Sequence, residues 1–250
     1  MHKQDARQYL DVAIDAAKKA GKYLSARAFQ SHIVDMNLLH DLKLQIDKRS
    51  EALLIRYLQK HTTFPILSEE CGLVGSKKDN ICWIVDPLDG TINYSRIIPF
   101  SCVSIGLWQE EKAILGVVYD FCRKEMFSGV VGQGAWLNGH KIMVSRVRKK
   151  EGAILATGFP AKMDLSRKNL ESFTRKVSAY KKLRLMGSAA LSLAYVAAGR
   201  FDAYTESDIM FWDVAGGIAL IEAAGGKVIM KKSNMINGYH VLACNGNFRM

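Results

Sequence analysis

The stretch from Cys82 to Asn93 constrains this 250-residue chain more than any other part of its sequence. It begins with a short apolar run that contains a β-branched pair, which is typical of a buried strand. Asp86-Pro87 follows at once, and because proline cannot extend a ladder of strand hydrogen bonds, we expect the strand to stop there. Asp89 comes three residues after Asp86, and a bend between them would bring both carboxylates to one point.

Gly90 and Thr91 follow these acids and add a flexible backbone, amide N–H donors and a hydroxyl. Carboxylate oxygens suit a divalent cation, and backbone amides at a turn or helix start suit a phosphate. Asp-Pro and Asp-Gly are also ordinary turn formers, so the hexapeptide alone is at least as typical of a plain turn. The functional interpretation therefore depends on acids elsewhere in the chain.

Composition and cysteine usage exclude several classes of protein. The chain is 49% hydrophobic with a mean hydropathy near zero, so we expect a soluble globular protein with a substantial core. No apolar run approaches membrane-spanning length, and the N-terminal residues lack the apolar segment of a signal peptide. Five cysteines without a Cys-x-x-Cys pair favour a reducing compartment, and the cytoplasm is the predicted location.

The formal net charge is +11, from 35 Lys and Arg against 24 Asp and Glu. Much of the excess falls at 146–150, 167–182 and 227–232, where basic residues are not stacked with aromatic ones. This pattern favours a solvated basic surface over a nucleic-acid groove. The resulting field would still attract an anionic substrate.

Residue periodicity changes character near residue 147. Earlier residues predict a helix at 5–25, a short strand at 41–47 that ends with Asp47, a second helix from Ser50, and then a mostly antiparallel sheet. Later residues alternate between strands and helices, which indicates an α/β arrangement. We therefore expect an N-terminal α+β half with most of the candidate metal ligands and a C-terminal α/β half with the substrate pocket, covering 1–146 and 147–250.

Acidic residues stand at the ends of several predicted elements. All but one follow a predicted strand, and the exception begins a predicted helix, where an N-cap acid that satisfies backbone amides is the plain alternative. Acids from distant parts of the sequence that met in space would form a cage too repulsive to persist without cations. The candidates are Asp47, Glu69, Glu70, Asp86, Asp89 and Asp213.

Two long motifs resemble the signatures of the inositol monophosphatase family. The first covers 83–93 and reads Trp-Ile-Val-Asp-Pro-Leu-Asp-Gly-Thr-Ile-Asn, and the second runs from Trp212 to Gly226. The resemblance spans nearly the whole chain. The family's other landmarks have counterparts in the same order at Asp41-Leu42 before Asp47, at Glu69-Glu70, and at Gly187–Ala190.

The resemblance implies a magnesium-dependent, lithium-sensitive phosphomonoesterase, usually a homodimer, with a layered αβαβα sandwich of the sugar-phosphatase type, in class terms α+β or α/β. It implies that Glu69, Asp86 and the Leu88 carbonyl hold one Mg²⁺. Asp86, Asp89 and Asp213 would hold a second ion, with Asp86 bridging the two. A third, weaker ion near Glu69 is common in the family.

The resemblance also implies catalytic and phosphate-binding roles. The implied catalytic residues are Thr91, Asp47 and Glu69, of which Thr91 and Asp47 would orient the attacking water and accept its proton. The amides of Gly90 and Thr91 would bind the phosphoryl oxygens. No covalent phosphoenzyme is needed for this reaction.

Substrate contacts are implied on the alcohol side of the site. Glu206 precedes Asp213 by seven residues, as in the family, and would hydrogen-bond a substrate hydroxyl. The alternative, nearly as well supported, is that Glu206 is an exposed acid without this role. The turn of Gly187, Ser188 and Ala189 would shape the same side. Departures from the family pattern leave the choice of substrate open, at Ser68, Cys71, Met210 and Phe211.

We predict hydrolysis of a small polyol or sugar phosphate. Inositol 1-phosphate is the first candidate, with histidinol phosphate and fructose 1,6-bisphosphate as alternatives among which the fold cannot choose. An alternative of another class is a binding partner of RNA or of the transcription machinery, which the charge of +11 motivates. The acids favour the enzyme, because a binding role does not require so many of them in a cluster.

Overall fold

The computed structural model describes residues 3–28, 36–76, 80–158 and 166–248. The described part contains six α-helices and a short 3-10 turn at Lys150–Gly152. None of these helices combines the length and apolarity needed to cross a membrane. The helices are α1 (Lys3–Ser25), α2 (Met36–His61), α3 (Thr91–Ser95), α4 (Arg167–Ser178), α5 (Ala189–Ala197) and α6 (Phe211–Ala223).

The strands of the described residues form two separate sheets. The large sheet has the order β2-β1-β3-β4-β5-β6-β7-β8, and it is antiparallel except where β1 pairs with β3. Its strands are β1 (Ile66–Ser68), β2 (Gly72–Val74), β3 (Ile81–Asp89), β4 (Cys102–Gln109), β5 (Lys112–Asp120), β6 (Glu125–Val130), β7 (Gly134–Leu137) and β8 (His140–Ile142).

The small sheet is mixed, with the order β10-β9-β11-β13-β12. The pairs of β9 with β10 and with β11 are parallel, whereas β13 runs antiparallel to both of its neighbours. The boundary between the sheets falls between residues 142 and 154, close to the predicted change at 147; that the two halves are domains stays a prediction. The strands are β9 (Ile154–Thr157), β10 (Lys182–Arg184), β11 (Ala203–Met210), β12 (Lys227–Lys232) and β13 (Gly238–Cys244).

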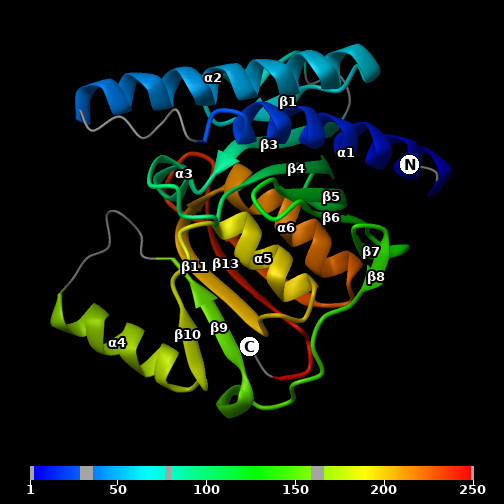
Figure 1. The fold of residues 1–250 in the computed structure, drawn as a ribbon. Coiled ribbons are helices and arrows are strands. Elements are labelled where there is room, and N and C mark those ends of the chain that lie inside the picture. The colour runs from blue at the N-terminus through cyan, green and yellow to red at the C-terminus, as the bar shows by residue number, and fades with distance from the viewer. Residues whose placement is uncertain (1–2, 29–35, 77–79, 159–165, 249–250) are drawn as a thin grey trace.

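Helices and sheets alternate in five layers, as Figure 1 shows. Helices α1 and α2 cover one face of the large sheet, α5 and α6 lie between the two sheets, and α4 covers the far side of the small sheet. Each interface buries apolar side chains, which is what holds stacked layers together. The expected layered αβαβα sandwich is confirmed.

The predicted strand at 41–47 is wrong, because helix α2 runs through it. The physical reason is visible in the part of α2 whose side chains are described. Four buried residues recur every four positions, so they form one face of a helix that packs against α1 and the large sheet: Ile46, Ser50, Leu54 and Leu58. Asp47 therefore lies on a helix and not at a strand end.

Helix α6 makes an unusually close approach to the large sheet. A Cβ atom on Gly116 of β5 would lie 2.1 Å from the Gly216 carbonyl oxygen, and one on Gly106 of β4 would lie 3.0 Å from the backbone of Ala215. A Cβ on Gly216 would in turn lie 2.7 Å from Ser104 Oγ. Glycines on both partners thus let the two backbones meet, and this contact sets where the first turn of α6 lies.

We expect Gly116→Ala to destabilise the fold by about 1–3 kcal/mol or more, because the added methyl group must push α6 away from β5. Urea denaturation of the purified protein measures this change. Gly152→Ala is a matched control, since its Cβ would be 3.6 Å from Val147 Cγ1, an ordinary contact distance. An equal loss of stability in the two variants would contradict the close approach as its cause.

Candidate active site

Asp86 and Asp89 lie at the end of β3, near the middle of the large sheet. The strand extends to Asp89, so the prediction that it stops at Asp86-Pro87 is wrong; an irregularity in its pairing with β4, between Asp86 and Asp89, accommodates the proline. Asp86 is 1% exposed and Asp89 8% exposed. Both carboxylates are therefore largely removed from water, which is costly for charged groups without compensation.

The residues after Asp86 form a tight turn into the short helix α3. The backbone N–H of Leu88 donates to Asp86 Oδ1 at 2.9 Å, and the Leu88 carbonyl accepts from the Thr91 hydroxyl at 3.0 Å. Gly90 has a φ of 83°, and a Cβ there would lie 2.8 Å from the Phe100 carbonyl oxygen. Only glycine fits this left-handed and crowded position, so the turn brings Leu88, Gly90 and Thr91 beside the two acids.

Four acids from three separate segments act on one another electrostatically. Burial raises the pKa of Asp86 well above its ordinary value, and the charges of Glu69, Asp89 and Asp213 raise it further. Burial is also the largest cause of the raised pKa of Asp213, and the charges of Asp89 and Glu69 raise it further. Asp213 arrives from the first turn of α6, which the glycine contact presses onto the sheet.

Asp89 is held by donors from the start of α5. Ser188 Oγ donates to Asp89 Oδ2 at 2.5 Å, and the backbone N–H of Ala190 donates to the same oxygen at 2.8 Å. Burial raises the pKa of Asp89, and these donors together with the Ala189 amide oppose the rise. The predicted substrate turn at Gly187–Ala189 therefore reaches the acid cluster, with the Ser188 hydroxyl bonded to Asp89.

Asp47 lies near α3, at 8% exposure. Its charge contributes, after burial and Tyr23, to the raised pKa of the Tyr94 phenol, so it lies within electrostatic reach of the helix that begins at Thr91. Glu69 and Glu70 stand in the exposed turn between β1 and β2. Only Glu69 of these two is among the acids that raise the pKa of Asp86.

Glu206 is fixed by a neighbour that sequence patterns do not single out. The Tyr204 hydroxyl donates to Glu206 Oε2 at 2.6 Å, and the backbone N–H of Gly158 also donates to this carboxylate. Burial raises the pKa of Glu206, and the charge of Asp89 adds to the rise. The exposed-acid interpretation is therefore wrong: Glu206 is partly buried and faces the acid cluster. The signal that could have found Tyr204 is its position two residues earlier on the same strand face.

The donor set fits a magnesium ion in its chemistry. Carboxylates and the Leu88 carbonyl are the hard oxygen ligands that Mg²⁺ takes, and the repulsion among the acids is what a cation would relieve. Among the described residues, no three His, Cys, Asp or Glu side chains are arranged to hold a metal ion as they stand.

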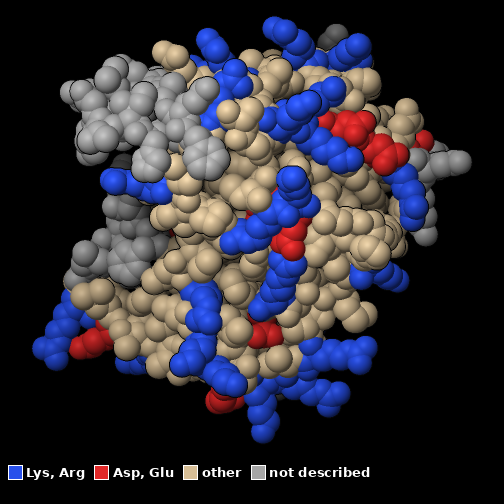
Figure 2. All heavy atoms as spheres, viewed as in Figure 1, with Lys and Arg blue, Asp and Glu red and all other residues tan. Residues whose placement is uncertain are grey.

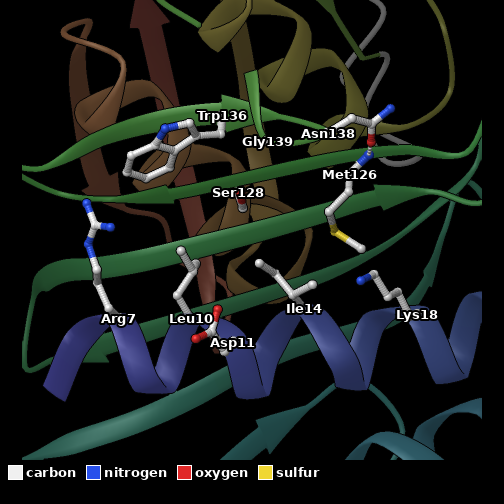
Figure 3. A pocket seen from close by; sticks show the side chains of 10 residues that line it. All are labelled: Arg7, Leu10, Asp11, Ile14, Lys18, Met126, Ser128, Trp136, Asn138 and Gly139. Atoms are coloured by element: carbon white, nitrogen blue, oxygen red, sulfur yellow. Dashed lines mark hydrogen bonds between the residues drawn. The ribbon is translucent and has the colours of Figure 1, made fainter. Parts of the chain in front are cut away.

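A separate hollow of about 570 Å³ lies between α1 and the strands β6 and β7, as Figure 3 shows. The Arg7 guanidinium lies 5.5 Å from the centre of the Trp136 ring at one end of it. Asp11 is the single acid among the described residues that line it, and no predicted site residue takes part. None of the clustered acids lines this hollow, so it lies outside the acid cluster. One acid beside two cations, Arg7 and Lys18, does not make a metal site.

We expect Asp86→Asn to stabilise the metal-free protein at pH 8, because it keeps an oxygen for the Leu88 N–H and removes a buried, repelled charge. The advantage should shrink as the pH falls, since a carboxyl whose folded-state pKa is raised gains stability on protonation. Urea midpoints in EDTA at pH 8 and 5.5 measure both effects. Mg²⁺ should raise the midpoint of the wild type only, and a lower midpoint for Asp86→Asn in EDTA would contradict repulsion.

Comparison with known proteins places the chain in a family. The model of the "Inositol monophosphatase family" matches residues 5–247. Inositol monophosphatase 3 of Solanum lycopersicum is 39% identical over 232 residues, and Nus factor SuhB of Escherichia coli K12 is 37% identical over 223; both alignments cover 88% of this chain, with 85% and 84% of the relatives. The inositol monophosphatase structure from Anabaena (Nostoc) sp. PCC 7120 superposes with a TM-score of 0.81 at 36% identity, covering 97% of this chain and 92% of that one. The chain belongs to the inositol monophosphatase family.

Proposed function

We propose that the protein hydrolyses phosphate monoesters of small polyols or sugars with Mg²⁺, and that inositol 1-phosphate is its first candidate substrate. One observation carries the proposal: the charges of Glu69 and Asp89 raise the pKa values of the buried Asp86 and Asp213, beside the turn that contains Gly90 and Thr91. Carboxylates gathered beside backbone amides suit a cation and a phosphate together. Family membership supports a phosphatase.

In the proposed chemistry, one set of residues binds the cation and another orients the attacking water. Bound Mg²⁺ supplies positive charge for the phosphoryl oxygens and lowers the pKa of water. Asp86, Asp89, Asp213, Glu69 and the Leu88 carbonyl are the residues that would hold it. The Thr91 hydroxyl, already fixed by its bond to the Leu88 carbonyl, and Asp47 on the α3 side orient the attacking water and take its proton.

The alcohol side of the site is proposed to be built from the small sheet. Glu206 accepts from Tyr204 and Gly158, which leaves carboxylate lone pairs for a substrate hydroxyl. Phe211 packs on Trp108 and Tyr239, with ring centres 4.9 and 5.1 Å away, so its ring is engaged in the core. Histidinol phosphate and fructose 1,6-bisphosphate remain the alternative substrates, and lithium sensitivity, the number of ions and a homodimer remain predictions.

Phosphate release from a panel of these three esters, with Mg²⁺ and with or without lithium, tests the proposal. We expect turnover that requires Mg²⁺ and falls by at least about 100-fold in Asp89→Asn, because a charged oxygen ligand is lost. Asp11→Asn, an exposed acid on α1, is the matched control and should retain activity. Absence of metal-dependent turnover on every ester would overturn the proposal.

A second candidate function is binding to RNA in association with the transcription machinery. Several relatives are named Nus factor SuhB, and Lys and Arg side chains are spread over the face in Figure 2 with fewer Asp and Glu. The backbone N–H of Lys181 donates to the carbonyls of Lys150 and Ala153, so two segments rich in exposed Lys and Arg, 148–150 and 181–184, lie side by side. Adjacent cations of this kind suit a phosphate backbone.

Fluorescence anisotropy with a single-stranded RNA tests this candidate. We expect the affinity to fall at least about tenfold between 50 and 200 mM salt, since neutralised phosphates release counterions. The double variant Lys149→Glu with Lys182→Glu should weaken binding further, whereas Lys18→Glu on α1 should not. No binding at 50 mM salt would dispose of this function, and binding retained in Asp89→Asn would separate it from hydrolysis.

A further inference from the structure

Glu51 is a buried acid that neither the sequence patterns nor the family resemblance assigned a role. It is 1% exposed and lies on α2, the helix that covers the edge of the large sheet where β1 and β2 meet. Its carboxylate is bonded to the β1–β2 turn, the segment that carries Glu69. Burying a carboxylate is costly unless donors surround it, so its surroundings require an explanation.

All of the hydrogen bonds described for the Glu51 carboxylate come from residues on either side of Glu69. Oε1 accepts from the Ser68 hydroxyl, from the Glu70 N–H at 3.1 Å and from the Cys71 N–H at 3.1 Å. Oε2 accepts from the Cys71 thiol at 2.9 Å, and this bond is the largest cause of the raised pKa of that thiol. One carboxylate thus fixes the residue before Glu69 and the two residues after it.

The geometry of this contact restrains the turn as a whole. Two successive N–H groups that point at one oxygen fix the orientation of the peptide planes between them, as in the backbone concavities that bind anions. The turn has only three residues, 69–71, because Ser68 pairs with Gly72. Little freedom therefore remains in the backbone of Glu69.

The preceding residue of α2 makes the corresponding contact to the other acidic segment. Ser50 is fully buried, and its hydroxyl donates to the Pro87 carbonyl at 3.1 Å, between Asp86 and Asp89. Two consecutive residues of one helix therefore reach the two segments that carry Glu69 and Asp86. A single helix therefore fixes the distance between the exposed β1–β2 turn and the buried end of β3.

We propose that Glu51 is a positioning residue that holds the β1–β2 turn so that the Glu69 carboxylate is placed to bind Mg²⁺ together with Asp86. The proposal rests on the proposed metal-dependent function. Glu51 itself does not touch the ion, since its oxygens are occupied by donors of the turn. Outer residues that orient metal ligands contribute to affinity in this way.

Calorimetric titration of the EDTA-treated full-length protein with Mg²⁺ tests the proposal without relying on activity. We expect Glu51→Ala to weaken Mg²⁺ binding by about 10–100-fold. Glu51→Gln should weaken binding less than Glu51→Ala, because its amide oxygen replaces Oε1 and still accepts from the turn, while its amide NH2 group leaves the Cys71 thiol without an acceptor. Glu111→Ala, which removes an exposed acid at the β4–β5 turn, is the control for net charge.

A second pair of variants works through Cys71 and keeps the proposal falsifiable should Glu51→Ala fail to fold. Cys71→Ser retains a donor to Oε2 and should bind like wild type, whereas Cys71→Ala should bind more weakly. In a Glu51→Ala background the Cys71→Ala change should have no further effect, since both act through one contact. Equal affinities for Cys71→Ala and Cys71→Ser would overturn the positioning role.

The remaining outcomes separate this proposal from the proposed function. Wild-type affinity in folded Glu51→Ala, beside a wild type that binds Mg²⁺ and hydrolyses an ester, would overturn the role of Glu51 alone. Equal loss in Glu51→Gln and Glu51→Ala would also overturn it, because charge and not geometry would then matter. A wild type that binds no Mg²⁺ would overturn both.

Discussion

The contact between helix α6 and the large sheet is the constraint on which the site depends. Gly106 and Gly116 on the sheet and Gly216 on the helix let the two backbones touch. Asp213 lies less than one helical turn before Gly216, so the same contact carries its carboxylate toward Asp86 and Asp89. A layered fold with ordinary helix–sheet spacing would hold this acid farther away.

The consequence of that contact is a site that opposes folding in the absence of a cation. Burial and the neighbouring acids raise the pKa values of Asp86 and Asp213 in the same direction. Around them are groups that lower the cost: the Leu88 amide at Asp86 and the Ser188 and Ala190 donors at Asp89. The fold therefore tolerates the acids through directed donors and not through exposure to water.

The parts of the fold and of the acid cluster that depend on local sequence patterns could be predicted. Periodicity and turn chemistry predict both the apolar run into Asp86 and the helix that carries Asp213 in its first turn, and four of the six candidate acids lie within electrostatic reach of one another. The alternation over 41–47 led to a wrong strand prediction. These residues belong to helix α2, whose buried face recurs every four residues from Ile46 to Leu58. The role of Asp47 in the water step stays a prediction.

The contacts that could not be predicted are mostly those between residues far apart in the sequence. Glu51 reaches donors 17 to 20 residues away, and Ser188 reaches an acid 99 residues away, so neither contact leaves a trace in local periodicity. Tyr204 is fully buried and reads as an ordinary strand aromatic until its hydroxyl is placed on Glu206. The bonds of Glu51 and Ser188 depend on tertiary structure, whereas acids at the ends of elements can be found from local patterns.

Glu206 stands on the small sheet, whereas Asp86 and Asp89 stand on the large one. It is the last regular partner of β13 before a bulge that ends at Ile209, and Asp208 within the bulge has a φ of 57°. Changes in the bulge can re-aim Glu206 while the opposite sheet stays as it is. Under the proposed function, the alcohol preference is therefore free to diverge during evolution, separately from the residues proposed to bind the phosphate.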